Sequence, residues 1–241
     1  MLNNLIIGTI VYNEENRFLK QYLEKISKLS NKLLFIDDGS TDNTVSILSQ
    51  YTSNIFQMDR QFEKDESIIR KAWWDNACKI ANENDFILIL DCDEFLTNNS
   101  INHFEEQLKI GIKLDCDALG MWRYDMWNKQ QYREDNIWKS HIKSWISCIK
   151  YNKYKTNKYP YWYNMKLHGG SYPINYYQSA YASLLQVQHM AYSSLELRKE
   201  KVKFYEHYDN NKNSSMQIQY NSILDENPTL IDFKDNFEDT K

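Results

Sequence analysis

The sequence is poor in the residues that break or cross-link a chain, and it has no long apolar run. Six glycines and three prolines in 241 residues are too few for a linker-rich, collagen-like or low-complexity protein. The four cysteines include no Cys-x-x-Cys pair and are too sparse for a disulfide framework. Apolar runs such as 86–90 fall far short of the roughly 20 residues that span a bilayer. These absences predict an ordinary soluble globular protein.

The N-terminus has no basic region ahead of its first apolar segment. Met1 is followed by Leu-Asn-Asn and then by a strand pattern, so no signal peptide is expected. Together with the sparse cysteines, this predicts a reduced protein of the cytoplasm. A chain of this length is expected to bury about three quarters of the surface that its unfolded form exposes. The sequence gives no indication of an oligomeric state.

Charge and aromatic residues are distributed unevenly along the chain. The formal net charge of −4 argues against a general nucleic-acid binder, and Phe, Trp and Tyr make up 15% of the residues. Residues 136–195, however, contain no acidic residue, seven lysines and thirteen Tyr or Trp. This segment therefore carries +7 and leaves −11 on the remaining 181 residues. The asymmetry predicts a face for an anionic partner and keeps nucleic acid among the candidates.

The first half of the chain alternates between apolar strand patterns and amphipathic helix patterns. Continuous apolar strands are expected at Leu5–Val11, 33–36, 54–58 and 86–90, with helices between them, of which the last covers 68–81. This alternation predicts a parallel sheet covered on both faces. The loops that follow the strands then meet at the carboxyl edge of the sheet, where ligands of such folds bind.

The second half shows a helix pattern, one strand pattern and two further helix patterns. They cover residues 100–110, 117–127, 195–208 and 216–224, and a turn is expected at 128–129. No repeat and no linker composition separates this half from the first. The sequence therefore predicts one domain over residues 1–241, of which the second half is an elaboration.

Three polar clusters follow predicted strands. They are Asn13-Glu14-Glu15, Asp37-Asp38 and Asp91-Cys92-Asp93-Glu94. Two carboxylates one residue apart suit Mg²⁺ or Mn²⁺, which neutralises a diphosphate. A capping acidic loop and a phosphatase-type nucleophile are the alternatives. A carboxylate after the second strand suits a base N–H or ribose hydroxyls. Turn and N-cap chemistry explains residues 39–42, which leaves Asp37 and Asp38 for function.

These motifs together resemble a known family. The segments 11–15, 36–42 and 90–94 resemble the successive signatures of family 2 glycosyltransferases with the GT-A fold. Residues 188–192, followed by a helix with Arg198, Lys201 and Tyr205, look like the late histidine segment of bacterial and phage members. Residues 220–228 resemble the C-terminal end of those members.

The resemblance implies a fold and an activity. The expected fold is an α/β GT-A domain, which is Rossmann-like, with a mostly parallel sheet flanked by helices. Residues 1–98 would form the nucleotide-sugar-binding half and residues 99–241 the acceptor side with the C-terminal helices. The expected activity is a metal-dependent, inverting transfer from a UDP-, dTDP- or GDP-sugar to an acceptor hydroxyl. The acceptor would be a glycan, a lipid-linked intermediate, a protein or a modified base of phage DNA.

The resemblance also implies site residues. The base would lie against residues 9–13, Arg70 would contact the diphosphate, and Mn²⁺ or Mg²⁺ would be held by Asp93 and His189 with Asp91 beside it. A structural role for His189 is the alternative. The full set of expected donor contacts is Thr9, Val11, Asn13, Glu15, Asp37, Asp38, Arg70, Asp91 and Cys92.

The catalytic base is less well defined. An inverting transfer needs a carboxylate or a histidine within reach of the acceptor hydroxyl. Candidates are Asp135 and Asp125, then His168 and Glu134. Asp135 is equally well explained by a salt bridge to Arg133, and Asp125 by its place at a strand end.

Two other classes of function compete with this one. A non-catalytic protein that keeps the pocket to bind a glycan or a nucleotide would not need Asp91 or Asp93. Nucleotidyl transfer on a related fold would need a glycine-rich phosphate loop, which is missing near residue 10.

Overall fold

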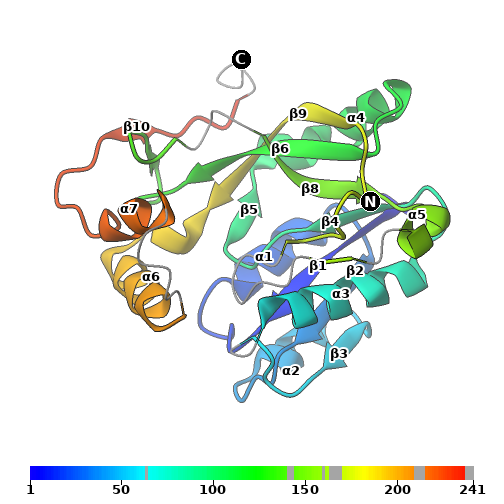
Figure 1. Cartoon of the computed structure of the whole chain (residues 1–241), viewed down its shortest axis with the longest axis horizontal. Helices are drawn as coiled ribbons and strands as arrows, with labels where there is room; N and C mark the ends of the chain where they lie inside the picture. The colour runs from blue at the N-terminus through cyan, green and yellow to red at the C-terminus, as the bar shows by residue number, and fades with distance from the viewer. Residues whose placement is uncertain (63–64, 140–143, 159–160, 163–169, 209–214, 237–241) are drawn as a thin grey trace.

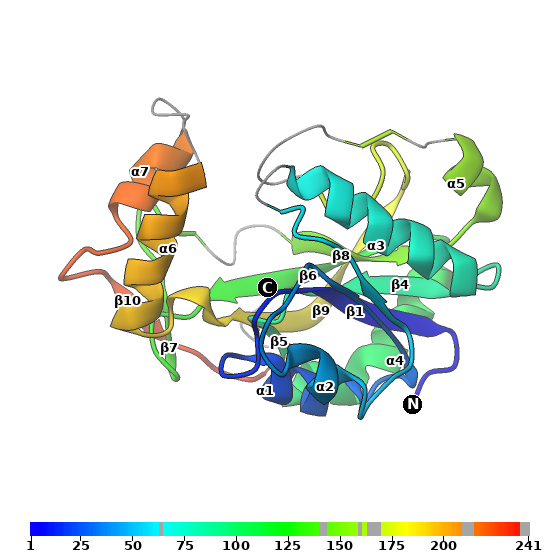
Figure 2. The ribbon, with the colours of Figure 1, turned by 90° about the horizontal axis from the view of Figure 1, so that it is seen from below.

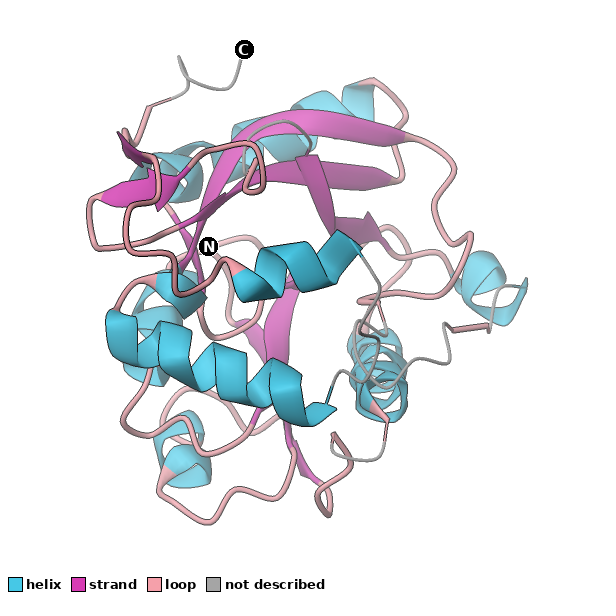
Figure 3. Ribbon diagram, turned by 60° about the vertical axis from the view of Figure 1, so that its left-hand side comes forward, coloured by secondary structure: helices cyan, strands magenta, loops and turns pink. Residues whose placement is uncertain are grey.

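The computed structural model describes residues 1–62, 65–139, 144–158, 161–162, 170–208 and 215–236. Within these ranges, an eight-stranded sheet has the strand order β3-β2-β1-β4-β8-β6-β9-β5, and helices lie on both sides of it (Figures 1 and 3). Its strands are β1 Leu5–Val11, β2 Lys32–Asp37, β3 Ile55–Gln57, β4 Phe86–Ile89, β5 Glu94–Leu96, β6 Ala118–Asp125, β8 Ser144–Lys150 and β9 Ala180–His189. The α-helices are α1 Leu19–Ile26, α2 Thr44–Leu48, α3 Glu66–Ile80, α4 Asn98–Lys113, α5 Lys153–Lys158, α6 Leu195–Tyr208 and α7 Ser215–Asn221.

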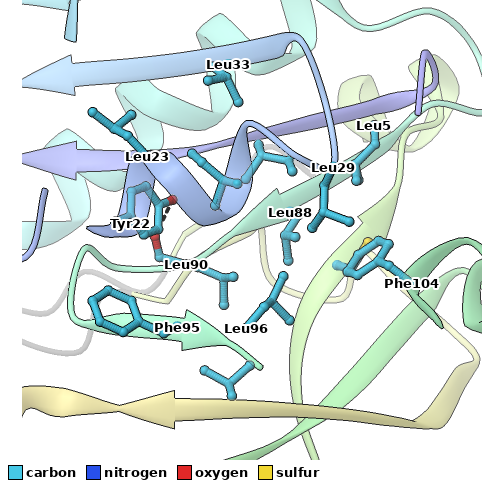
Figure 4. Close-up of a cluster of buried hydrophobic side chains, with 14 of the residues drawn as sticks. Leu5, Tyr22, Leu23, Leu29, Leu33, Leu88, Leu90, Phe95, Leu96 and Phe104 are labelled. Carbon is cyan, nitrogen blue, oxygen red and sulfur yellow. Dashed lines mark hydrogen bonds between the residues drawn. The ribbon is translucent and has the colours of Figure 1, made fainter. Parts of the chain in front are cut away.

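The first half of the chain forms the parallel part of the sheet. β1 pairs in parallel with β2 and β4, and β2 pairs in parallel with β3. Leu5 and Ile7 of β1 pack on one face with side chains from α1 and α4, whereas Ile6 packs on the other face with α3. Figure 4 shows the first cluster, in which the Tyr22 hydroxyl of α1 donates to the Leu90 carbonyl at 2.9 Å. Strands that are apolar on both faces need this cover on both sides.

The second half extends the same sheet with mixed pairing. β8 runs antiparallel to β4 and β6, β9 runs parallel to β6, and β5 pairs antiparallel with β9. Four of the seven pairings in the sheet are therefore parallel. The α/β fold with a mostly parallel sheet flanked by helices, expected from the sequence, is confirmed.

The C-terminal helices α6 and α7 stand to one side of the sheet, with a small sheet of β7 Gln131–Arg133 and β10 Leu230–Asp232 next to them (Figure 2). Trp127 and Trp138 form a cluster here with side chains from both helices. Arg133, which is only 2% exposed, donates to the Ser222 carbonyl at 2.5 Å and pairs with Asp225 at 2.7 Å. This arginine therefore connects β7 with the segment that follows α7.

Some elements differ from the sequence prediction. The helix expected over 68–81 begins at Glu66, because the Asp65 carboxylate accepts a hydrogen bond from the Ser67 N–H at 2.8 Å and caps it. The strands β5, β8 and β9 were not predicted. Among the described residues, none of the helices is both long and apolar enough to cross a bilayer.

Candidate active site

A cleft of about 1230 Å³ lies between the carboxyl ends of β1, β2 and β4 and the C-terminal helix α6. A second cavity of about 560 Å³ adjoins it. The two cavities share six lining residues, namely Glu66, Arg70, Asp91, Glu94, Arg123 and Trp145. All three polar clusters predicted from the sequence contribute to the wall of the larger cleft, through Glu14, Asp38 and residues 91–94.

The loop after β1 is held by the loop after β2. Asn13 has a positive φ of 51°, a conformation that asparagine tolerates better than most residues. Its side-chain oxygen accepts from the Thr41 N–H at 2.8 Å, and its own N–H donates to Ser40 Oγ at 2.9 Å. The Glu15 carboxylate accepts from the backbone and side chain of Asn43 at 3.1 and 2.7 Å. As the structure stands, Asn13 and Glu15 therefore fix the two loops to each other.

The two carboxylates after β2 are enclosed. Asp37 is 1% exposed and accepts from the Ser40 N–H at 3.2 Å. Asp38 is 0% exposed and accepts from the N–H groups of Gln61 at 2.7 Å and Phe62 at 3.1 Å, and also from Arg60. Both oxygens of Asp38 are therefore used to hold the segment after β3.

Arg70 and Asp91 form the floor of the cleft. Two guanidinium nitrogens of Arg70 donate to the two oxygens of Asp91 at 2.8 and 3.0 Å, and its Nε donates to Glu66 at 3.0 Å. The buried Thr9 hydroxyl also donates to Asp91, at 3.2 Å. Burial raises the pKa of Asp91, but the charge and hydrogen bonds of Arg70, the Lys201 charge and the Thr9 hydrogen bond together outweigh this effect and hold the pKa well below its usual range. Asp91 is therefore a fixed anion.

Strand register brings three acidic or basic groups to the end of β9. His189 lies opposite Asp125 of β6 and opposite Glu94 of β5. Its Nδ1 lies 2.6 Å from Asp125 Oδ1, and its Nε2 lies 3.9 Å from Asp93 Oδ2. The carboxylate on Nδ1 orients the ring, so Nε2 is the nitrogen that faces Asp93. Neither Asp93 nor His189 would be placed in this way without β9.

Two more charged groups surround Asp93. Lys201 of α6 places Nζ 4.0 Å from Asp93 Oδ2. Burial lowers the pKa of Lys201, but the nearby Asp93, Tyr205 and Asp91 together outweigh this effect and the net shift of the pKa is upward. Glu14 Oε2 is buried without a hydrogen-bond partner, and burial raises the Glu14 pKa to about 7.

The side chains of Asp93 and His189 can bind a divalent cation. Asp93 and His189 supply a carboxylate oxygen and an imidazole nitrogen that face each other. Mn²⁺ or Mg²⁺ can bind ligands of these two kinds. The buried Oε2 of Glu14, which has no hydrogen-bond partner, is a further oxygen atom in this part of the cleft. Among the residues that the structure describes, no group of three His, Cys, Asp or Glu side chains forms a complete ligand set. Substrate or water would have to complete the coordination.

The remaining predicted residues fall in different places. Val11 and Cys92 are buried and line the cleft, and burial raises the pKa of the Cys92 thiol well above its ordinary value. Asp125 also lines the cleft. Asp135 does not line either cavity, because its carboxylate accepts from Arg133 Nε at 2.6 Å and from the backbone of residues 137 and 138. His168 lies outside the described residues.

Of the other side chains of the cleft, Glu94 was named from the sequence only as the end of the third polar cluster, and Arg123 and Trp145 were not named. Glu94 accepts from the Asp91 N–H at 3.1 Å and from Arg123 at 3.3 Å, and burial raises its pKa. The Arg123 guanidinium lies 4.3 Å from the centre of the Trp145 ring. A signal existed only for Glu94, which directly follows Asp93.

Comparison with known proteins gives the family. The model of Glycosyl transferase family 2 matches residues 6–161, which is more than half of the chain. The chain therefore belongs to glycosyl transferase family 2, and the expectation that it is a nucleotide-sugar-dependent glycosyltransferase is confirmed. No curated protein sequence matches the chain at a significant level.

Solved structures with a similar course of the chain include TarS of S. aureus. Residues 1–349 of TarS are 15% identical over 92% of this chain and 69% of that one, with a TM-score of 0.49. A longer TarS chain is 13% identical over 92% of this chain and 42% of that one, with a TM-score of 0.49. TarS 1–349 in complex with UDP is 14% identical over 92% of this chain and 70% of that one, with a TM-score of 0.48.

Proposed function

We propose that the chain transfers a sugar from a nucleoside diphosphate sugar to an acceptor hydroxyl, with a divalent cation held by Asp93 and His189. The observation that carries this proposal is the 3.9 Å approach of His189 Nε2 to Asp93, with Asp125 on the other ring nitrogen. Histidine ligands of metal ions are usually oriented in this way, by a carboxylate that binds the other ring nitrogen.

The bound cation would supply positive charge for the diphosphate that leaves with the nucleoside. The chain's own residues prepare the same place. Arg70 holds Asp91 as an anion beside Asp93, and Lys201 brings an ammonium group from the opposite wall. Lys201 therefore faces the position of a diphosphate and neutralises part of its charge.

The nucleoside is expected at the β1 and β2 end of the cleft. Val11 and Cys92 line this end, and Asn13 and Glu15 fix its loops. Thr9 and Asp37 are buried beneath it, at 0% and 1% exposure. Their proposed role is therefore to shape the donor site from below.

The acceptor is expected on the side of the smaller cavity and α6. Trp145 and Tyr172 line that cavity, and aromatic rings stack on sugar rings. Lys139, from the acid-free segment, reaches the larger cleft. This distribution supports an anionic acceptor, which would be a glycan, a lipid-linked intermediate, a protein or a modified DNA base. A salt-dependent mobility shift of DNA would favour the last of these.

An inverting transfer also needs a base. Of the predicted bases within the described residues, Asp125 lines the cleft while Asp135 does not. Asp125 is engaged with His189 at 2.6 Å, so its first role is to orient that ring. The choice among the candidate bases, the inversion itself and the cytoplasmic location stay predictions.

The proposal is tested by donor hydrolysis. A panel of UDP-, dTDP- and GDP-sugars with Mn²⁺ is screened by thermal unfolding, because a ligand that binds the native state raises the Tm. The hydrolysis of the best donor is then followed for the wild-type chain and Asp93→Ala. We expect the variant to lose the Mn²⁺-dependent rate by about 100-fold or more. An unchanged Mn²⁺-dependent rate would contradict the proposal, and glycan binding without any hydrolysis would favour the non-catalytic alternative.

A further inference from the structure

The short helix α5 has a basic and aromatic outer face. Its exposed residues form two pairs, each four positions apart, and are Lys153, Tyr154, Asn157 and Lys158. The Lys158 Nζ lies 5.7 Å from the centre of the Tyr154 ring. Tyr154 is 69% exposed, and Tyr161, shortly after the helix, is 71% exposed. Apart from Met1, these two are the most exposed of the large apolar or aromatic side chains that the structure describes.

The carboxylates beside α5 are used within the fold. Glu83 accepts from the Asn152 side chain at 3.0 Å and from the Lys153 N–H at 3.1 Å, at the start of the helix. Asp117 pairs with Lys155 at 2.7 Å, on the inner face of the helix. Residues 150–158 contain four lysines and no acidic residue. The outer face of α5 is therefore positively charged.

The position of α5 makes this face accessible to a large partner. The helix lies at the end of the molecule opposite α6 and α7 (Figures 1 and 2). None of its residues lines either of the two cavities described above, so the helix presents a projecting surface and no groove. The Tyr161 carbonyl accepts from the N–H of Ile174 at 2.8 Å, and Ile174 lines the smaller cavity. Tyr161 therefore connects the surface of α5 with the wall of that cavity.

Exposed lysines and tyrosines on a projecting surface fit a membrane that contains anionic lipids. The negative surface potential of such a membrane attracts lysines that lie next to it. A tyrosine has an apolar ring and a polar tip, and it is enriched where lipid headgroups meet water. A nucleic-acid strand would instead be expected in a basic groove with rings in its walls.

We propose that Lys153, Tyr154, Lys158 and Tyr161 form a docking surface for a membrane with anionic lipids. The membrane would then lie beside the smaller cavity, where a lipid-linked acceptor can reach it. The docking itself does not depend on the proposed function, because contact with a membrane requires neither a donor nor a cation.

The proposal is tested by co-sedimentation of the full chain with lipid vesicles. The wild-type chain is expected to bind vesicles of equal parts phosphatidylserine and phosphatidylcholine about tenfold or more tightly than pure phosphatidylcholine, and added salt should weaken this binding. Lys153→Gln/Lys158→Gln should bind the anionic vesicles about 25-fold more weakly, because each lysine near such a surface strengthens binding about fivefold. Tyr154→Ser/Tyr161→Ser should bind them about fivefold more weakly, since it removes apolar area from the contact.

A matched control removes the same charge elsewhere. Lys20→Gln/Lys28→Gln changes two exposed lysines in and after α1, which packs on the face of the sheet opposite α3 and the tyrosines next to α5. This variant should bind the anionic vesicles within about twofold of the wild-type chain. Thermal unfolding shows that each variant is folded. The α5 variants should keep the wild-type rate of donor hydrolysis in solution, because the changed residues line neither cavity.

The proposal would be overturned if the wild-type chain bound no anionic vesicles at low salt, or if Lys153→Gln/Lys158→Gln bound them as tightly as the wild type. An equal loss in the control variant would also overturn it, because total charge and not this surface would then be responsible. DNA binding that is lost in the α5 variants, without vesicle binding, would assign the surface to nucleic acid instead. A wild-type chain that docks on vesicles but hydrolyses no donor would contradict the proposed function alone.

Discussion

At the end of β9, the imidazole of His189 is held by Asp125 on one nitrogen and faces Asp93 with the other. The sequence could point to Asp91, Asp93 and His189, because each belongs to a short motif whose neighbours are close in the chain. Lys201 also belongs to the helix that follows the histidine segment, but its approach to Asp93 depends on where that helix returns to the cleft. The position of Arg60 depends in the same way on a loop, and no local pattern predicts either approach.

Lys201 gives the first prediction at this scale. Lys201→Met should weaken UDP binding about tenfold and leave UMP binding within about twofold, because only the diphosphate reaches the ammonium group. Lys203→Met, on the exposed side of α6, is the control and should change neither affinity. The affinities are measured by calorimetry with Mn²⁺ present. Equal losses for UDP and UMP would show that Lys201 serves the fold of α6 instead.

Glu14 gives a second prediction, which concerns pH. Burial raises the Glu14 pKa to about 7 in the folded chain, against 4.5 as its ordinary value; Arg17 opposes this shift and Asp93 adds to it. The folded chain therefore binds a proton that the unfolded chain has released, so this group lowers the free energy of unfolding as the pH rises from about 4.5 to 7. Glu14→Gln removes this loss and should be more stable than the wild-type chain at pH 8, by up to about 3 kcal/mol.

The measurement for Glu14 is urea unfolding in metal-free buffer at a series of pH values. The stability difference between Glu14→Gln and the wild-type chain should grow between pH 4.5 and 7 and then level off. The exposed Glu24→Gln on α1 is the control and should show no such growth. A difference that does not change with pH would mean that Glu14 is not a buried, proton-binding group.

At the scale of elements, the parallel strands were predictable and the added strands were not. β1 and β4 are continuous apolar runs bounded by polar loops, and that pattern needs no knowledge of the partner strand. β9 instead buries Ser183 and Gln186, which are accommodated by hydrogen bonds such as the one from Ser183 Oγ to the Gly120 carbonyl at 2.7 Å. Polar residues in a buried strand interrupt the apolar pattern by which a strand is predicted. Their hydrogen-bond partner is about 60 residues away in the chain, so the local sequence does not show that they can be buried.

The pairing of β1 with β2 leads to the prediction for this scale. A Cβ at Gly8 would lie 1.7 Å from the Leu34 carbonyl oxygen, so Gly8→Ala must push the two strands apart. We expect a loss of about 3 kcal/mol or more in the free energy of unfolding. Gly111→Ala in α4 is the control, because its Cβ would meet side chains and no backbone: the end of Leu119 at 3.1 Å and the Tyr181 ring at 3.7 Å. It should shift stability by about 1 kcal/mol or less.

Urea unfolding at pH 7 measures both glycine variants. The same samples are tested for UDP binding, because β1 leads directly into Tyr12 and Glu14 of the cleft. A Gly8→Ala chain with wild-type stability would show that β1 and β2 do not pair as described.

At the scale of the whole molecule, the aromatic and basic residues of the segment 136–195 have more than one role. Trp138, Tyr151, Tyr176 and Tyr192 are buried in the core. Trp145, Tyr154 and Tyr161 are exposed instead. Lys155 pairs with Asp117 at 2.7 Å and so is used within the fold. Of the segment 136–195, the residues that remain to contact an anionic partner are therefore the exposed rings and lysines such as Lys139 at the cleft.

The two halves of the chain meet at the cleft, and this meeting explains why the site was only partly predictable. Asp91 and Asp93 come from the acidic half, whereas His189 comes from the basic segment 136–195 and Lys201 from the helix α6 that follows it. Sequence motifs identified the first pair together with His189. The approach of His189 and Lys201 to Asp93 depends on where β9 and α6 lie in the folded chain, which the sequence motifs do not show.

The most direct test of the account is the dependence of nucleotide binding on Mn²⁺. UDP, or the best nucleotide of the panel, is titrated into the wild-type chain and Asp93→Ala, each with Mn²⁺ and with EDTA. The account predicts that Mn²⁺ tightens binding at least tenfold in the wild-type chain and by less than about twofold in Asp93→Ala. An equal effect of Mn²⁺ on both chains, or no effect on the wild-type chain, would contradict it.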